Sequence, residues 1–264
     1  MEDKGHSLYS AEQVRELDRR AIADHGIPGY TLMQRAARAC WKALSERWPQ
    51  ARSVCVVCGA GNNGGDGYEI ARLARAAGWR VHVLVAGSVP TGGDARRASA
   101  AWQADGGVTL PFDGPLPAAD IVVDALFGTG LKRQLDAGAI AVVHAINAAR
   151  AAGARTVAVD LPSGLDASTG TAAYGAAVQA DLTVSFIGRK FGLYTAQGPQ
   201  LAGECVFDAL ELPAVVYAQM PPLAHLQMAG QLCALLPRRA RIAHKGDHGH
   251  VLLVGGNHGM AGAV

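Results

Sequence analysis

Short apolar runs rich in valine and isoleucine alternate along this chain with longer segments of helical period. Glycine or polar residues bound each run, as is typical of buried strands. The strands predicted in this way span residues 54–58, 80–86, 120–124, 156–160, 182–186 and 204–207. Strands that alternate with helices predict a parallel sheet with helices on both faces. We therefore expect an α/β fold, a Rossmann-like three-layer sandwich with a mainly parallel central sheet.

Two helices are expected before this sheet. Ser10 and Gln13 have the spacing of a capping box, which marks a helix start. The apolar face of this first helix is formed by Val14, Leu17, Ala21 and Ile22. The second helix spans about residues 31–47, and later helices are predicted at about 68–77, 91–105 and 136–152.

A glycine-rich segment, Gly59–Gly67, lies between the first strand and a helical run. A strand, a tight turn and a helix together place backbone N–H groups against an anionic ligand. The spacing Gly-x-Gly-x-x-Gly also matches the dinucleotide fingerprint, which requires an acidic residue at the end of the second strand. That strand ends in Val85-Ala86-Gly87, so a hydride-transferring dehydrogenase is not favoured. No Gly-Lys-Ser/Thr follows the loop, which excludes a P-loop.

Polar residues also follow two later strands. Asp124 and Gly128–Gly130 follow the third predicted strand, and Asp160 and Ser163 follow the fourth. Ligands of open α/β sheets bind beyond the carboxyl ends of the strands. Together with the glycine-rich segment, these residues predict one ligand site at this edge of the sheet.

The amino-acid composition indicates a globular protein and argues against nucleic-acid binding and a membrane span. The 264 residues are 50% hydrophobic and 17% charged, which is typical of a globular chain. A formal net charge of +2 with scattered Lys and Arg gives no indication of nucleic-acid binding. The uncharged segment 212–237 contains Pro221-Pro222 and several Gln and His residues, so we expect no membrane span.

Cysteine usage and the N-terminus predict a cytoplasmic location. Five cysteines without a framework spacing fit a reducing compartment, and Met1–Lys4 lacks the apolar run of a signal peptide. Cys55 and Cys58 lie three residues apart on a predicted strand, so their side chains are expected on opposite faces. No second Cys pair completes a zinc site, and we interpret both as core thiols.

Four motifs together resemble the NAD(P)H-hydrate epimerase family, of the YjeF N-terminal type. They are Gly59–Gly67, Val123–Leu131, Val159–Asp166, and Ser185-Phe186 with Lys190–Leu193. They occur in the family's order, and the resemblance covers about residues 10–215. It implies interconversion of the R and S forms of hydrated NADH and NADPH, in which water has added at C6 of the nicotinamide ring, as a step in cofactor repair.

A second resemblance begins at His244. Residues 244–257 and 259–263 are similar to the opening of the ribokinase-like NAD(P)H-hydrate dehydratase domain, as in fused bifunctional repair enzymes. We therefore expect an epimerase domain at 1–217, a linker at 218–243 and the start of a dehydratase domain at 244–264. Dehydratase activity is expected only in a longer chain.

The resemblance implies a reaction at a carbinolamine carbon. Protonation of the C6 hydroxyl expels water and leaves a flat iminium that water can attack from either face. One group must therefore donate and take back a proton at that oxygen. Asp160 is predicted for this role, because partial burial at the end of a strand favours its protonated form. Lys190 is predicted to orient the hydroxyl or to balance the charge of Asp160.

The resemblance also implies binding residues. Those expected to hold the diphosphate, the riboses and the ring are Asn62, Asn63, Gly64, Gly65, Asp66, Gly128, Thr129, Gly130, Leu131, Lys132, Arg133, Gln134 and Asp160. Lys132 or Arg133 would supply positive charge. Family members also bind a potassium ion (K+), and the matching positions here are Asn63, Asp124 and Ser163, which offer the oxygen ligands that a hard cation prefers.

Other classes of function stay open at this point. The chain could be a non-catalytic nucleotide- or partner-binding Rossmann-like module, although the presence of Asp160 and Lys190 argues against that. It could also be an unrelated nucleotide-dependent transferase. The expected partner is a small-molecule substrate, with no nucleic acid and no membrane. A homo-oligomer, with segment 212–237 packed on a second subunit, is an alternative that the sequence leaves open.

Overall fold

The computed structural model of this protein describes residues 6–131, 134–172 and 174–227, and the single positions 230, 242, 244, 246, 250 and 252. The elements named below belong to a compact unit that ends at Leu226. Its helices are α1 (Ala11–Arg19), the π-helical turn η2 (Arg20–Asp24), α2 (Gly29–Arg47), α3 (Asn62–Ala76), α4 (Gly93–Ala104), α5 (Ala137–Ala151), α6 (Gly198–Ala202), and the 3-10 turns η3 (Phe191–Tyr194) and η4 (Ala214–Tyr217). Its strands are β1 (Ser7–Tyr9), β2 (Ser53–Cys58), β3 (Arg80–Val85), β4 (Thr109–Pro111), β5 (Ile121–Ala125), β6 (Arg155–Val159), β7 (Leu182–Phe186), β8 (Arg189–Lys190), β9 (Glu204–Asp208) and β10 (Ala224–His225).

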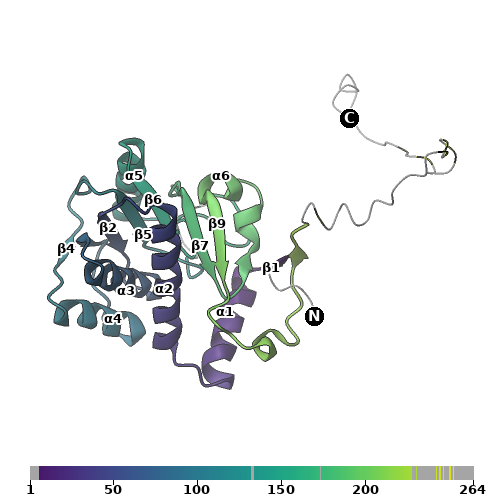
Figure 1. The fold of residues 1–264 in the computed structure, drawn as a ribbon, viewed down its shortest axis with the longest axis horizontal. Coiled ribbons are helices and arrows are strands. Elements are labelled where there is room, and N and C mark those ends of the chain that lie inside the picture. The colour runs from purple at the N-terminus through teal and green to yellow at the C-terminus, as the bar shows by residue number, and fades with distance from the viewer. Residues whose placement is uncertain are drawn as a thin grey trace. The chain divides into compact units, whose positions relative to one another are not determined.

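Seven strands of the described residues form one sheet, in the order β4-β3-β2-β5-β6-β7-β9. Every neighbouring pair is parallel, and Val56 at the centre of β2 lies between Val83 of β3 and Val123 of β5. A parallel strand pair requires a crossover connection, and α3, α4 and α5 supply such connections (Figure 1). The expected Rossmann-like α/β sandwich is confirmed.

Helices cover both faces of the sheet, and each face has its own core. Val54, Val56 and Cys58 of β2 pack with residues of α2 and α3, whereas Cys55 and Val57 pack with residues of α5. Both cysteines are fully buried and free. Side chains alternate between the faces of a strand, so the predicted placement of the two thiols on opposite faces is confirmed.

The helix after β2 begins earlier than its sequence pattern suggested. The capping box at Ser10 is present as expected, but α3 starts at Asn62 rather than near Tyr68, so most of the glycine-rich segment is helical. Glycine in a helix costs about 0.5–1 kcal/mol relative to alanine. Close packing explains the glycine here, because a Cβ on Gly64 would overlap the carbonyl oxygen of Gly59. The absence of that Cβ lets α3 approach the end of β2.

A small second sheet connects both ends of this unit. Within the described part of the chain it contains β10, β1 and β8, with β1 parallel to β8 and antiparallel to β10. Leu223 N–H donates to the Leu8 carbonyl at 2.8 Å, and Leu226 N–H donates to the His6 carbonyl at 2.8 Å. Residues 218–226 of the predicted linker thus belong to the first unit.

Two further predictions concern the dehydratase-like segment and membrane-spanning helices. The dehydratase-like segment 244–264 lies almost entirely outside the described residues, so that domain assignment stays a prediction. Among the helices that are described, none combines the length and the apolar character needed to cross a bilayer.

Candidate active site

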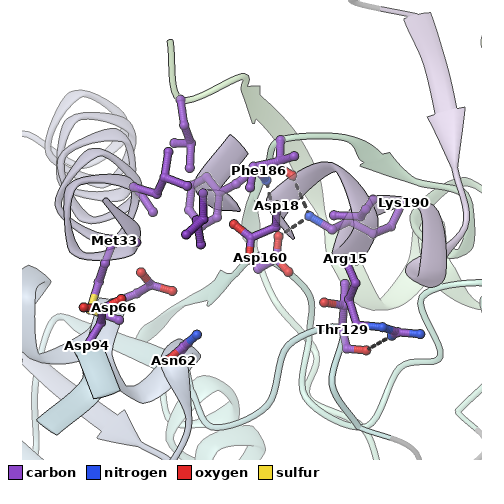
Figure 2. Close-up of a pocket in the computed structure, with 17 residues that line it drawn as sticks. Arg15, Asp18, Met33, Asn62, Asp66, Asp94, Thr129, Asp160, Phe186 and Lys190 are labelled. Carbon is purple, nitrogen blue, oxygen red and sulfur yellow. Dashed lines mark hydrogen bonds and ion pairs between the residues drawn. The ribbon is translucent and has the colours of Figure 1, made fainter. Parts of the chain in front are cut away.

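A pocket lies where loops from the carboxyl ends of the strands meet helices α1 and α2 (Figure 2). Its polar lining residues are Arg15, Asp18, Asn62, Asp66, Asp94, Thr129, Asp160 and Lys190. Five of these, Asn62, Asp66, Thr129, Asp160 and Lys190, were predicted from the sequence. The fold therefore gathers predicted residues from three loop regions and from β8 around one cavity.

The Lys190 ammonium forms an ion pair with the Asp160 carboxylate at the wall of this pocket. The Lys190 Nζ also donates to the Phe186 carbonyl at 2.8 Å and to the Ser185 hydroxyl at 3.2 Å. The lysine side chain is only 1% exposed, so these three acceptors are what compensate its burial. The proton-transfer role predicted for Asp160 stays a prediction, and the structure places this carboxylate beside the Lys190 ammonium.

The backbone around this ion pair is strained. Asp160 has a φ of 70° and Ile187, which also lines the pocket, has a φ of 66°. Residues with a Cβ rarely adopt this left-handed region, at a cost of about 1–3 kcal/mol. Asp160 N–H donates to the Val184 carbonyl at 2.8 Å, which holds the turn after β6 against β7. The strain aims the Asp160 side chain at the cavity.

Helix α3 contributes its first two turns to the pocket. Asn62 is the first residue of α3, and Asp66 follows one turn later, with both side chains facing the cavity (Figure 2). Burial raises the pKa of Asp66 well above its ordinary value, and the nearby Asp160 and Asp18 carboxylates raise it further. An N-terminal helix turn with this composition can receive a polar or anionic ligand group.

Helix α1 supplies site residues that the sequence reasoning missed. Arg15 Nη1 donates to the Thr129 carbonyl at 2.7 Å, and Asp18 lines the same pocket one turn further along. The sequence did hold a signal, because Val14, Asp18 and Ile22 recur every four residues on one helical stripe. A carboxyl on a predominantly apolar, inward stripe is unusual in a helix that serves only as packing.

The predicted potassium ligands do not line the pocket, and two of them bind each other. The Ser163 hydroxyl donates to Asp124 Oδ1 at 2.6 Å, and Ser163 N–H donates to Asp124 Oδ2 at 2.8 Å. Phe127 N–H in turn donates to the Ser163 hydroxyl at 3.0 Å. Asp124 and Ser163 are both fully buried, and burial raises the pKa of Asp124 to about 6 although the Ser163 hydrogen bonds lower it. A buried carboxylate of this kind is a suitable ligand for a cation.

The third predicted potassium ligand, Asn63, is the second residue of α3. Its Oδ1 is 3.5 Å from the position that a Cβ on Gly128 would take, and Asp160 Oδ2 is 3.4 Å from that position. Asn63 is buried, and its Nδ2 has no hydrogen-bond partner among the described residues. An amide, a carboxylate and a hydroxyl form an oxygen donor set that fits a hard monovalent cation.

Other predicted binding residues lie elsewhere or cannot be placed. Gly64 and Gly65 are buried in α3, and Gly130, Leu131 and Gln134 do not line the pocket. Leu131 packs on the core beside α5, and Gln134 Oε1 lies 3.7 Å from a Cβ position on Gly175. Lys132 and Arg133, which were expected to supply positive charge, fall outside the described residues.

Comparison with known families identifies the domain. The family model "YjeF-related protein N-terminus" matches residues 29–192, a range that includes the glycine-rich segment, Asp124, Asp160 and Lys190. The chain belongs to this family. The match ends at Gly192, so β9 and the strand β10 lie beyond the part that the family model describes.

Curated relatives extend this likeness over nearly the whole chain. It is 44% identical over 259 residues to the bifunctional NAD(P)H-hydrate repair enzyme Nnr of Coxiella burnetii, covering 97% of this chain and 52% of that protein. It is 40% identical over 261 residues to the Escherichia coli enzyme of the same name, covering 98% and 50%. The chain thus spans about half the length of these relatives.

A shorter relative matches almost end to end. The NAD(P)H-hydrate epimerase of Limosilactobacillus fermentum is 40% identical over 204 residues, covering 75% of this chain and 93% of that protein. Among solved structures, the yeast protein ynu0 superposes with a TM-score of 0.69 at 19% identity, covering 85% of this chain and 98% of that one. The second comparison supports the fold alone.

Proposed function

We propose that this chain is an NAD(P)H-hydrate epimerase, which interconverts the R and S forms of hydrated NADH and NADPH at C6 of the nicotinamide ring. The observation that carries the proposal is the buried Asp160–Lys190 ion pair at the wall of a pocket formed by the family's motifs. The epimerase of Limosilactobacillus fermentum, which this chain matches over 93% of its length, supports the same reaction. A non-catalytic binding role is not favoured.

The charge of the pocket suits the reaction. Four carboxyl groups, those of Asp18, Asp66, Asp94 and Asp160, line it. The two described cations in the lining, Arg15 and Lys190, are already bound to Thr129 and Asp160. Loss of water from C6 leaves a positively charged iminium on the ring, and preorganised carboxyl oxygens of the lining stabilise such a state. These carboxyl groups would repel a diphosphate, so we place the ring beside them and the phosphates at the edge of the pocket, near the first residue of α3 and the loop that follows Thr129.

We further propose that Asn63, Asp124 and Ser163 hold a potassium ion. The support is the buried Asp124 carboxyl, the burial of Asn63 and Ser163, and the shared oxygen chemistry of the three side chains. When bound, the ion would offset the buried charge of Asp124 and thereby stabilise the turn that carries Phe127 and Gly128. Proton transfer at C6 is assigned only to side chains of the pocket.

We also propose a substrate class and a cellular location for this chain. The expected partner is a hydrated nicotinamide dinucleotide, without nucleic acid or membrane. Free cysteines at positions 40, 55, 58 and 205 fit a cytoplasmic protein. The dehydratase step of the bifunctional relatives is assigned to a longer chain.

The experiment supplies the purified chain with mixed R and S hydrated NADH and an excess of a separate S-specific dehydratase. Recovery of reduced-cofactor absorbance from the R form then reports epimerisation, after the spontaneous rate is subtracted. Asp160→Asn is the matched variant, because asparagine tolerates the positive φ at this position better than alanine does. We expect a fall of at least ~100-fold in the enzymatic rate. Recovery by the unaltered chain no faster than the blank would refute the proposed function.

A further inference from the structure

Asp18 of helix α1 lies close in sequence to three arginines but pairs with none of them. Asp18 is flanked along the chain by Arg15, Arg19 and Arg20. Arg15 binds the Thr129 carbonyl, and Arg19 and Arg20 bind Glu16. Asp18 itself has no hydrogen-bond or ion-pair partner among the described residues, although three cations lie within five positions of it.

Instead, Asp18 faces the active-site pocket. Its side chain and that of Asp160 converge on the cavity from α1 and from the end of β6 (Figure 2). Burial raises the pKa of Asp18, the Asp160 carboxylate raises it further, and Lys190 lowers it. Asp94 also raises it, so the charged groups that act on Asp18 come from every side of the pocket. Lys190 is committed to three acceptors, and Asp18 is therefore an unpaired carboxyl beside the ion-paired Asp160.

Inversion at C6 requires more than one proton-transfer group if both faces of the ring react. Water leaves from one face and enters from the other, and the acid for one direction is the base for the reverse direction. A single carboxyl fixed at the end of β6 serves one face. Two carboxyls that reach one cavity from different elements can supply an acid and a base at the same time.

We propose that Asp18 is the second catalytic carboxyl of this site, which exchanges the proton of water at the face of C6 that Asp160 does not serve. This inference rests on the proposed function. In one direction Asp18 protonates the C6 hydroxyl, the C6–O bond breaks with its electron pair on the departing water, and the N1 lone pair forms the N1=C6 bond. A second water then bonds to C6 and passes a proton to Asp160, while the N1=C6 pair returns to N1. The net change is one proton moved from Asp18 to Asp160, and exchange with solvent water returns a proton to Asp18 and removes one from Asp160 before the next turnover.

Asp66 is the competing candidate in the pocket, and its chemistry is different. Burial and the nearby Asp160 and Asp18 carboxylates raise its pKa well above the ordinary value. A group that alternates between acid and base needs a pKa close to the working pH. Burial and Asp160 raise the pKa of both groups, but that of Asp66 more strongly, so Asp18 is the better candidate for this exchange.

The test is incorporation of oxygen from ¹⁸O-labelled water into each epimer by wild type, Asp18→Asn and Asp160→Asn. The epimers are separated after the reaction and their masses are measured. We expect Asp18→Asn to lose inversion by at least ~100-fold. It should still exchange oxygen with retention in one epimer, whereas Asp160→Asn should exchange only in the other.

Controls separate a catalytic role from loss of structure. Glu12→Gln removes an exposed carboxyl of the same helix and should invert at the wild-type rate. Asp18→Glu should recover part of the inversion and shift its pH profile, which a purely structural role would not do. Inversion by Asp18→Asn at the wild-type rate, or loss of exchange in both epimers alike, would overturn the proposal. A wild-type chain that neither inverts nor exchanges would instead refute the proposed function.

Discussion

The Lys190 ammonium binds the Asp160 carboxylate although the two residues lie thirty positions apart and belong to different sheets. Asp160 follows β6 of the large parallel sheet, and Lys190 lies in β8 of the small sheet. The ion pair therefore joins the two sheets at the pocket. Strand β1 pairs with both β8 and β10. We therefore expect substitutions in β1 or β10 to alter the position of Lys190 and, through this ion pair, the candidate active site.

Replacing Lys190 by methionine should destabilise the fold and stop epimerisation. The change leaves a mostly buried Asp160 carboxylate without its partner, which costs about 3 kcal/mol or more in the free energy of unfolding. The double variant Lys190→Met/Asp160→Asn should regain much of that stability but no activity. Urea unfolding of the four proteins in this cycle measures the coupling. Additive effects of the two substitutions would show that the ion pair contributes nothing to stability.

Potassium should stabilise the protein more than sodium or choline does at equal ionic strength. If Asn63, Asp124 and Ser163 bind the ion, K+ at ten times its Kd adds about 1.4 kcal/mol to the free energy of unfolding. Asp124→Asn should abolish this response. Asp120→Asn is the matched control, because Asp120 adjoins the other end of the same strand and also accepts backbone N–H groups, at 2.8 and 2.9 Å. A response that survives in Asp124→Asn would exclude the site.

Gly64→Ala should destabilise the fold even though alanine is the better helix former. The new Cβ would overlap the Gly59 carbonyl oxygen, and overpacking of this kind typically costs about 1–3 kcal/mol. Gly130→Ala is the control, because a Cβ there meets no atom within 4 Å. Thermal unfolding of both variants gives the comparison. An unchanged or higher melting temperature for Gly64→Ala would show that α3 can move away from β2 at no cost.

The thiols of β2 should resist alkylation in the folded protein. Burial raises the pKa of Cys55 to about 12 and raises that of Cys58 as well, so almost no thiolate is present at pH 8. Cys205 is only partly buried, and we expect it to react before Cys40, Cys55 or Cys58. Peptide mass spectrometry after iodoacetamide treatment, with and without denaturant, identifies the modified positions. Rapid modification of Cys58 under native conditions would argue for a reactive thiol pair.

The layout of the large sheet could be predicted from the sequence because it depends on local signals. Valine-rich runs predicted most of its strands, and the polar residues after them predicted which edge carries the site. Asn62, Asp66, Thr129, Asp160 and Lys190 do meet in one pocket, since the carboxyl ends of parallel strands share an edge. Strand β4 was missed because Thr109–Pro111 is short and largely exposed.

Only the tertiary structure decided which of these residues contact one another and which others join them in the pocket. The start of α3 depends on how closely Gly64 approaches Gly59, a contact that helix propensity does not include. Arg15 and Asp18 join the site because α1 packs across the mouth of the pocket, and periodicity alone does not say what an inward carboxyl will face. The sequence by itself determined the parallel sheet, the motifs and the edge of the sheet at which the pocket lies. Contacts between distant segments determined that Asp160 pairs with Lys190 and that Asp18 stays unpaired among the described residues. Burial and the distance to the nearest charge are set only in the folded chain.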